Sequence, residues 1–256
     1  IDSREDSKTD LDVPFYHGAE VSNTFGRQGL NSIIVKKNNT ESKIEVDCLA
    51  VSGGWNPTLH LTCHMNGRPT WDEKILSFVP ENGAIPNMAV VGAANGLMDT
   101  HSCFASAQKE IGLIIKAFGK TAKTKRLPKA EITKYEISPK WCVDGKGRAW
   151  LDYQNDVTVK DIQQSVKENF KSVEHMKRYT TQGMAIDQGK NSNVAALAVL
   201  ADATGRGIPE TGTTTFRPPF VPVSIASMGK NAQGIGFAPQ RYTTSHVASV
   251  DRGAPM

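Results

Sequence analysis

The sequence predicts an α/β lobe, then a small all-α helical domain, then an extended tail. Three observations support this order. Short segments with alternating side chains lie within residues 19–51, and a glycine-rich turn precedes a helical pattern over residues 99–118. Helical spacing dominates residues 158–204. Threonine and proline then crowd residues 211–222, where proline disfavours a helix.

The composition is ordinary for a globular protein and points away from nucleic acid and membranes. The chain has 256 residues, 39% of them hydrophobic, and a net charge of +4. No apolar run approaches the ~20 residues that a membrane helix needs. The basic run at residues 120–129 contains no aromatic residues, which favours a solvated linker over a nucleic-acid patch, with electrostatic docking of a partner subunit left open.

The chain ends and the cysteines bear on the type of protein. A start at Ile1 and a polar end at Met256 are expected of a fragment. The four cysteines are scattered and form no Cys-x-x-Cys pair, which favours reduced thiols in a cytoplasmic protein.

The first part of the chain predicts short strands. Residues 19–25, 32–36 and 43–51 read as strands of an antiparallel meander or of the tail of a nucleotide-binding lobe. Residues 52–57 hold two glycines and a proline, which predicts either a tight backbone approach to another group or an ordinary turn.

Three residues after this turn have the spacing of metal ligands on a helix. They are His60, Cys63 and His64. No fourth ligand lies nearby, and no His-Glu-x-x-His arrangement occurs. We therefore favour structural or solvent-facing histidines and predict no metal site.

A strand, a glycine turn and a helix start together predict a dinucleotide site. Residues 88–91 predict a short buried strand, a turn with Gly92 and Gly96 follows, and a helix begins near Asp99 or Thr100. The positive end of a helix and its free N–H groups suit a pyrophosphate, although helix–strand packing explains the glycines equally well. The helix has an apolar face made of Phe104, Ala107, Ile111, Ile114 and Phe118, and Gly119 ends it.

The following residues predict a connector and a hairpin. Residues 120–140 are basic and contain prolines, which is typical of an interdomain linker. Residues 141–150 predict a hairpin with Asp144 and Gly145 at its turn.

Three helices are then expected. Thr158 and Asp161 form a capping box at the start of the first, and Ser172 caps a second that Gly183 ends. The first should bury Val159, Ile162, Val166 and Phe170, and the second Val173, Met176 and Tyr179. A polar turn at residues 187–190 leads to a third helix, which Asn193 caps and Gly205 closes.

The motifs KRYTT, DQGK-SN and GTTTFRPP, in this order, resemble the alpha subunit of heterotetrameric sarcosine oxidase. The helical stretch resembles the small domain related to bacterioferritin-associated ferredoxin, in which four cysteines hold a [2Fe-2S] cluster. On that alignment Asp152 and Gln154 replace the first cysteine pair, and Asp187 and Ser192 replace the second. The resemblance therefore implies a domain without an iron–sulfur cluster.

The resemblance also implies four segments of an internal fragment. Residues 1–119 would be the C-terminal part of an NAD-binding lobe of the two-dinucleotide-binding-domain reductase type, and residues 120–140 a basic linker. Residues 141–210 would be the helical domain, and residues 211–256 an extended connector towards an absent folate-binding domain.

The implied site residues belong to cofactors, and no catalytic residue is expected in this chain. An NAD site would be lined by Gly92, Ala93, Gly96, Met98 and Thr100, with Ala93 standing where flavin-binding relatives have an acid. A surface facing FMN would contain Lys177, Arg178, Thr180, Thr181 and Lys190, although a solvated or helix-capping loop is the alternative. Arg217 is a candidate partner for a phosphate or carboxylate.

The implied activity is that of an oxidoreductase acting on CH–NH groups. Sarcosine would be demethylated to glycine, oxygen reduced to hydrogen peroxide, and the one-carbon unit passed to tetrahydrofolate. The complex would hold FAD and FMN and contain beta, gamma and delta subunits. The alternatives are a subunit of a related flavin-dependent proline, opine or cyanide-forming dehydrogenase, whose members usually keep the cluster cysteines, and a non-catalytic NAD-binding scaffold subunit.

Overall fold

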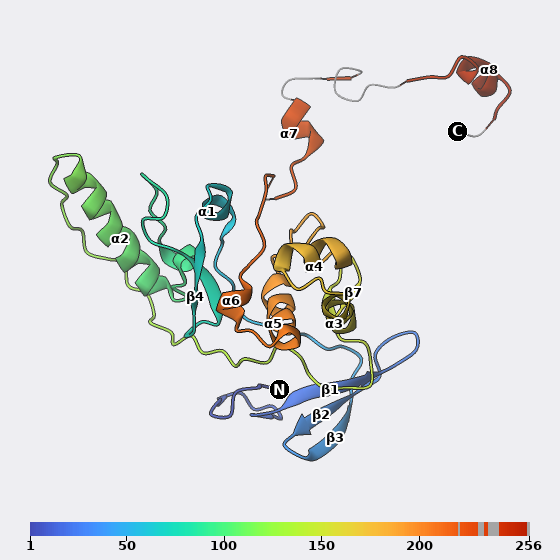
Figure 1. The fold of residues 1–256 in the computed structure, drawn as a ribbon, viewed down its shortest axis with the longest axis horizontal. Coiled ribbons are helices and arrows are strands. Elements are labelled where there is room, and N and C mark those ends of the chain that lie inside the picture. The colour runs from blue at the N-terminus through green and yellow to red at the C-terminus, as the bar shows by residue number, and fades with distance from the viewer. Residues whose placement is uncertain (220, 230–232, 235–240, 255–256) are drawn as a thin grey trace. The chain divides into compact units, whose positions relative to one another are not determined.

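The computed structural model describes residues 1–219, 221–229, 233–234 and 241–254, and it divides into two units, Ile1–Phe220 and Val221–Met256 (Figure 1). The expected connector at residues 211–256 therefore lies partly outside the described residues. No helix in the described ranges is long and apolar enough to cross a membrane.

The first unit begins with an antiparallel meander of β1 (Glu20–Phe25), β2 (Ser32–Lys37) and β3 (Thr40–Glu45). Ala19, Ile33 and Val35 form a small core on one of its faces. The strands expected at residues 19–25 and 32–36 are confirmed. The strand expected at residues 43–51 ends early, because β2 begins opposite Glu45 and offers the later residues no partner in its ladder.

A short helix, α1 (His60–His64), leads to a hairpin of β4 (Pro69–Asp72) and β5 (Ser77–Pro80). The strand expected at residues 88–91 is wrong: this segment pairs with no strand of the described chain and is only half-buried or exposed. A turn of 3-10 helix, η1 (Gly92–Asn95), follows it.

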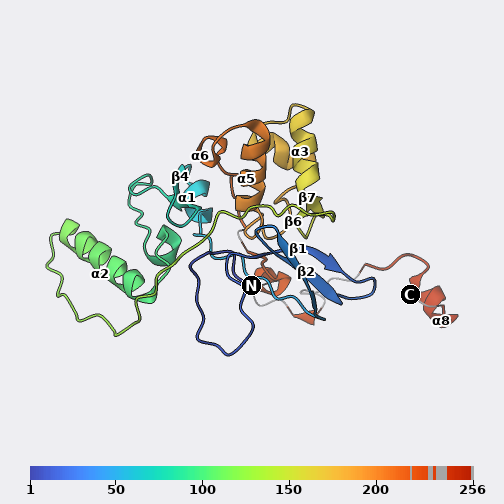
Figure 2. The ribbon, with the colours of Figure 1, turned by 90° about the horizontal axis from the view of Figure 1, so that it is seen from below.

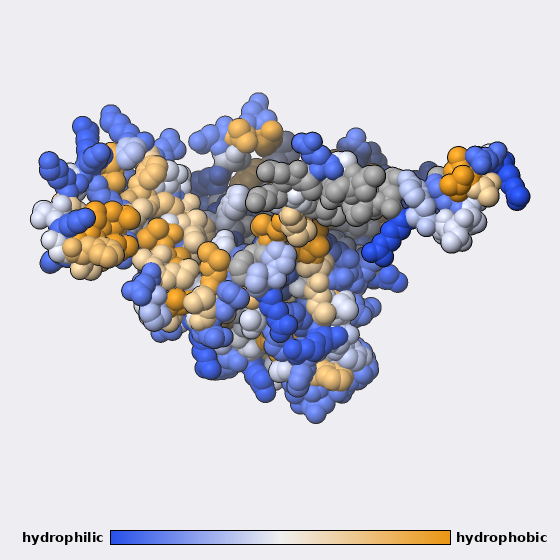
Figure 3. Space-filling model, turned by 90° about the horizontal axis from the view of Figure 1, so that it is seen from above, coloured by the Kyte–Doolittle hydropathy of each residue, from blue (hydrophilic) through white to orange (hydrophobic). Residues whose placement is uncertain are grey.

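The helix expected near residue 99 is α2 (Thr100–Ala117), and its start is confirmed. The Asp99 carboxylate caps it by accepting a 2.9 Å hydrogen bond from the backbone N–H of Ser102. None of its residues is buried in this chain, and Phe104, Ile111, Leu113 and Ile114 are exposed. Hydrophobic surface gathers over α2 at the left of Figure 3. The helix is therefore amphipathic, as expected, but the described chain does not bury its apolar face.

After α2 the chain turns back and returns along the helix, as Figures 1 and 2 show. The side-chain amide of Gln108 donates to the backbone oxygen of Lys125 and ties the two together. Residues 120–149 contain no helix or strand, so the hairpin expected at residues 141–150 is wrong. β6 (Trp150–Asp152) pairs instead with β7 (Val157–Thr158), which lies directly before the first helix of the next region.

That region contains α3 (Val159–Lys167), α4 (Val173–Thr180), α5 (Asn193–Thr204) and the short α6 (Ile208–Thr211). The Thr158–Asp161 capping box and the Ser172 cap are both confirmed. Gly205 closes α5 in the left-handed conformation, also as expected.

Three details of these helices differ from expectation. Tyr179 is 41% exposed and packs against Phe170, which lies beyond the end of α3. Thr181, not Gly183, is the left-handed residue that ends α4. Ser192 precedes α5 as its N-cap residue, and the Asn193 side chain bonds elsewhere.

The main hydrophobic core joins the helical region to the α1–β5 segment. Its buried members are Leu59, Cys63, Phe78, Leu151, Val157, Val159, Ile162, Val173, Met176, Ala196, Leu197, Val199, Leu200 and Phe216. Side chains from before and after residues 120–140 thus share one core. The second unit contains two further short helices, α7 (Ile225–Gly229) and α8 (His246–Asp251), where an extended tail was expected.

Candidate functional site

A cleft of about 680 Å³ lies between the segment before α1 and the start of α5. Residues 51–60 form one wall, and residues 189–194 form the other. Ser77 and Phe78 of β5, Tyr153 of the β6–β7 turn, and Thr213 and Phe216 after α6 complete the lining. No lining residue is acidic.

Asn56 connects the two walls. Its side-chain amide donates a 3.4 Å hydrogen bond to the backbone oxygen of Lys190, and its side-chain oxygen accepts a 3.0 Å hydrogen bond from the Ser77 hydroxyl. Beside it, Gly54 has a φ of +98°, and a Cβ there would lie 2.8 Å from the Tyr135 hydroxyl. The tight backbone approach considered for this turn is thus present, and Tyr135 is the group that comes close.

Positive charge in the cleft comes from Lys190, which lies close to His60. The pKa of His60 is lowered, first because burial disfavours the charged ring and second because the Lys190 ammonium repels it. The His60 ring also meets the edge of Phe216, with ring centroids 4.5 Å apart. Lys190 is therefore a cation of this cleft, beside a histidine whose pKa is lowered.

Two large aromatic side chains of the lining are accessible: Trp55 is 74% exposed and Tyr153 is 80% exposed. Aromatic faces stack on planar rings, and an ammonium group attracts an anion. The cleft is therefore suited to a planar ligand that carries a negative group.

The residues expected to face FMN are not gathered in this cleft. Only Lys190 lines it. Arg178 lies 3.5 Å from the Glu174 carboxylate, Thr180 donates to the backbone oxygen of Met176 one turn earlier, and Thr181 ends α4. Lys177 is half-buried in the last turn of α4. Helix-capping and helix-surface roles account for the contacts of Arg178, Thr180 and Thr181.

Arg217 does not line the cleft, but its backbone is bound by the polar turn before α5. Its backbone oxygen accepts a hydrogen bond from the Gln188 amide, and its N–H donates to the Gln188 side-chain oxygen.

The residues expected to hold NAD do lie together, in η1 and the start of α2. Ala93 and Thr100 are exposed, and Met98 is half-buried. Gly96 serves packing, because a Cβ there would lie 2.9 Å from both Ile75 and Val79. The Asp99 carboxylate stands at the helix start, where the expected pyrophosphate would meet a negative charge.

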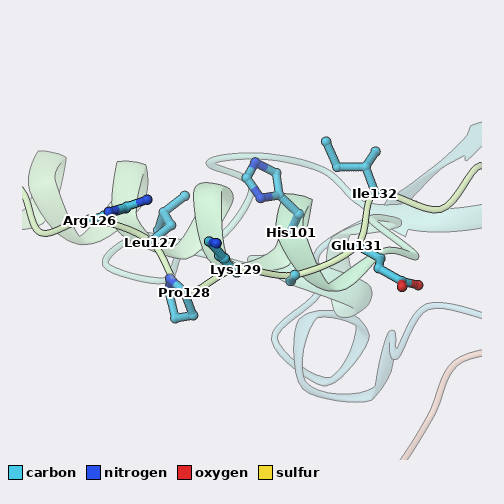
Figure 4. Close-up of a pocket in the computed structure, with 8 residues that line it drawn as sticks. His101, Arg126, Leu127, Pro128, Lys129, Glu131 and Ile132 are labelled. Atoms are coloured by element: carbon cyan, nitrogen blue, oxygen red, sulfur yellow. The ribbon is translucent and has the colours of Figure 1, made fainter.

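A shallow hollow of about 710 Å³ lies beside the first turn of α2. Figure 4 shows residues 126–132 running past the helix, with the His101 ring beside them. Arg126 and Lys129 supply positive charge, and Glu131 supplies a negative one. All seven residues of this segment belong to the linker that returns along α2.

The positions that correspond to cluster cysteines hold hydrogen-bonded polar groups. Asp152 is 3% exposed, and its carboxylate accepts from the backbone N–H groups of Gln154 and Gly183 at 2.9 and 2.8 Å. The Ser192 hydroxyl accepts a 2.7 Å hydrogen bond from the Gln182 amide, and Asp187 accepts from the N–H of Gly189. These groups do not fit an iron–sulfur cluster, which needs thiolates. In the described ranges no three His, Cys, Asp or Glu residues form a metal-binding group.

Most of the cleft was missed at the sequence level. Two stretches gave a signal: the SGGWNP turn, whose glycines and proline pointed to a close approach, and the polar turn that carries Lys190. Tyr153 carried no recognisable motif, and Asn193 was expected only as a helix cap, because both reach the cleft through tertiary packing.

Comparisons with known proteins agree on one family. The model of the sarcosine oxidase A3 domain matches residues 146–232. The chain is 36% identical over 239 residues to the sarcosine oxidase subunit alpha of Rhizobium meliloti (strain 1021), which covers 92% of this chain and 24% of the relative. It is 37% identical over 222 residues to the subunit alpha of Corynebacterium sp. (strain U-96), covering 83% of this chain and 23% of the relative.

A solved structure shares the fold. The L-proline dehydrogenase from P. horikoshii aligns with a TM-score of 0.59 and 17% sequence identity, over 80% of this chain and 43% of that one. The similarity concerns only the fold, a mixed α/β arrangement, because a shared fold does not imply a shared activity. The chain spans about a quarter of the length of the curated relatives it matches, and over most of its own length it is similar to sarcosine oxidase alpha subunits.

Proposed function

We propose that this chain is part of the alpha subunit of a sarcosine oxidase. The complex would oxidise sarcosine to glycine, reduce oxygen to hydrogen peroxide and pass the one-carbon unit to tetrahydrofolate. The observation that carries this proposal is the 36% identity over 92% of the chain to a protein of that name. Beta, gamma and delta subunits would be its partners.

The cleft supports a role in holding a flavin. Its donor set is the Lys190 ammonium and neighbouring amides, and its accessible walls include the Trp55 and Tyr153 rings. An FMN has a planar ring system and a phosphate, which match these two kinds of group. When bound, the flavin would supply the electron transfer, while Lys190 would hold its phosphate. The acid-free lining keeps repulsion of the phosphate low.

The NAD part of the proposal concerns η1 and the start of α2. Ala93, Met98 and Thr100 are the side chains that would contact NAD. Gly92 and Gly96 shape the turn, and Gly96 also makes room for Ile75 and Val79. The NAD would stabilise the lobe. FAD and tetrahydrofolate would bind to other parts of the complex.

The test is oxygen uptake with sarcosine by the full-length parent chain co-expressed with its genomic neighbours. Iron, flavin and NAD should be quantified in the same preparation. Sarcosine-dependent uptake with flavin and NAD present and iron absent is the expected result. Iron without sarcosine turnover would indicate a subunit of a related amino-acid dehydrogenase. Bound NAD with no oxidase activity in any subunit combination would indicate a scaffold.

A further inference from the structure

Residues 212–219, here named the strap, form an extended segment over the helical region. Burial alternates along it: Thr214 and Phe216 are 3% and 6% exposed, while Thr215 and Arg217 face outward. Alternation is the pattern of a strand, yet the strap pairs with no strand of the described chain. Its backbone groups are instead bound by side chains.

Gln188 makes the most extensive of these contacts. Its amide nitrogen donates to the backbone oxygens of Arg217 at 2.6 Å and Pro219 at 3.0 Å, and its amide oxygen accepts from the Arg217 N–H at 2.9 Å. The nitrogen and the oxygen of this amide thus both bind one short stretch of backbone. This pairing needs a donor and an acceptor in one side chain, which an amide has and a carboxylate lacks.

Two more side chains complete the attachment. The Asn193 amide donates to the backbone oxygen of Gln188 and to the Thr214 hydroxyl, so it links the Gln188 turn to the strap. The Glu174 carboxylate of α4 accepts a 3.1 Å hydrogen bond from the Thr215 N–H. Figure 1 shows the strap passing between α1 and α4.

The strap also forms part of the cleft. Thr213 and Phe216 line it, and the Phe216 ring packs in the main core against His60. Gln188 directly precedes Gly189 and Lys190, which lie on the wall at the start of α5. One turn thus carries both the cation of the cleft and the residue that binds the strap.

We propose that Gln188 is a positioning residue that holds the strap closed along the cleft and so controls access to Lys190. The ligand class, a planar anion such as FMN, rests on the proposed function. The strap itself does not, because its bonds are made within the chain. Loss of the Gln188 bonds would release residues 217–219 first, since Thr214 and Phe216 remain anchored by burial.

The test variant is Gln188→Glu in the full-length alpha subunit co-purified with its partners. The carboxylate keeps the shape but cannot donate to the Arg217 and Pro219 oxygens, so amide exchange in the strap should rise roughly tenfold or more. Acetylation of Lys190, followed by mass spectrometry, should also become faster. The matched control is Gln163→Glu, the same change at an exposed position of α3.

Each outcome decides one point. Faster exchange in the strap with normal exchange in α3–α5, and with Gln163→Glu unchanged, supports the proposal. Wild-type exchange in the strap overturns it, and so does faster exchange throughout α3–α5, which would make Gln188 a general stability residue. Faster exchange in the strap with unchanged flavin content would support the role of Gln188 but contradict the proposal that the cleft binds FMN. The two proposals can therefore fail separately.

Discussion

The carboxylate of Asp152 accepts a 2.8 Å hydrogen bond from the backbone N–H of Gly183, 31 residues further along the chain. The same carboxylate binds the N–H groups of Gln154 and Asn155, at 2.9 and 3.3 Å. It therefore joins the β6–β7 turn to the loop after α4, at a position that the resemblance described above pairs with a cluster cysteine.

We expect Asp152→Ala to destabilise the helical region by about 2–4 kcal/mol. The buried N–H of Gly183 and the part-buried N–H groups of Gln154 and Asn155 would lose their acceptor, and a buried donor without a partner is costly. Thermal unfolding of the full chain with its partners would measure the loss. Asp202→Ala, at an exposed position in the last turn of α5, is the control and should change stability little. Equal effects of the two substitutions would contradict the role given to Asp152.

Gly189→Ala should be far more damaging than Gly205→Ala. Both glycines have a left-handed backbone, with φ of +73° and +68°. A Cβ at Gly189 would lie 2.0 Å from the Asn193 side-chain oxygen, whereas nothing lies within 4 Å at Gly205. Gly205→Ala should cost only the backbone strain, about 1 kcal/mol. Gly189→Ala should cost roughly 2 kcal/mol more, because it also displaces Asn193 from Gln188 and Thr214.

Chemical denaturation of both variants would separate the two effects. The difference between them isolates the contact with Asn193, since the conformational cost is shared. A double variant, Gly189→Ala with Asn193→Ala, should recover part of the loss. No recovery would mean that the contact is not the cause.

The stability of the protein should fall as the pH drops below about 6.5, and His60 should account for part of this fall. Burial and Lys190 hold the pKa of His60 below its ordinary value of 6.5. The unfolded chain therefore takes up a proton at a higher pH than the folded protein does, which favours unfolding as the pH falls through this window.

The variant His60→Gln should flatten this part of the stability profile. Denaturation midpoints measured from about pH 7.5 down to about pH 5 would show a smaller decline than in the unaltered protein. His175→Gln, at an exposed position of α4, provides the comparison. A decline as steep as in the unaltered protein would show that burial of His60 does not set the pH response.

Replacement of Lys190 should affect flavin retention more than replacement of Arg178. Lys190 lines the cleft, whereas Arg178 is 3.5 Å from Glu174 on the surface of α4. We expect Lys190→Ala to lower flavin content per complex at least severalfold, and Arg178→Ala to leave it close to normal. Flavin absorbance after gel filtration of the complex would measure both. The reverse order of effects would move the flavin-facing surface to α4.

Local signals predicted the parts of the fold that depend on neighbouring residues. The Thr158–Asp161 capping box, the Ser172 cap and the glycine that closes α5 were all readable, because each acts over three or four residues. The meander was readable for the same reason, since β1, β2 and β3 follow one another with short turns.

Signals that depend on distant partners failed. The hairpin expected around Asp144 did not form, because the β6 residues pair with β7 instead. The apolar residues 88–91 resembled a buried strand but lack a strand to pair with in the described chain. Tyr179 has helical spacing with Met176, yet it packs on Phe170 at the surface. Pairing and burial are properties of two segments, and one segment's pattern does not contain them.

The sequence by itself determined the starts of α3 and α4, the end of α5, the strands at residues 19–25 and 32–36 and, through its motifs, the resemblance to sarcosine oxidase alpha subunits. Only the tertiary structure decided the cleft, because Asn56, Gln188 and Phe216 come from three separate stretches that meet through side-chain bonds and a shared core. The sequence also placed Lys190 among five candidates without distinguishing it. The fold distinguished it by placing it in the lining of the cleft beside His60, whose pKa is lowered first by burial and second by the Lys190 charge.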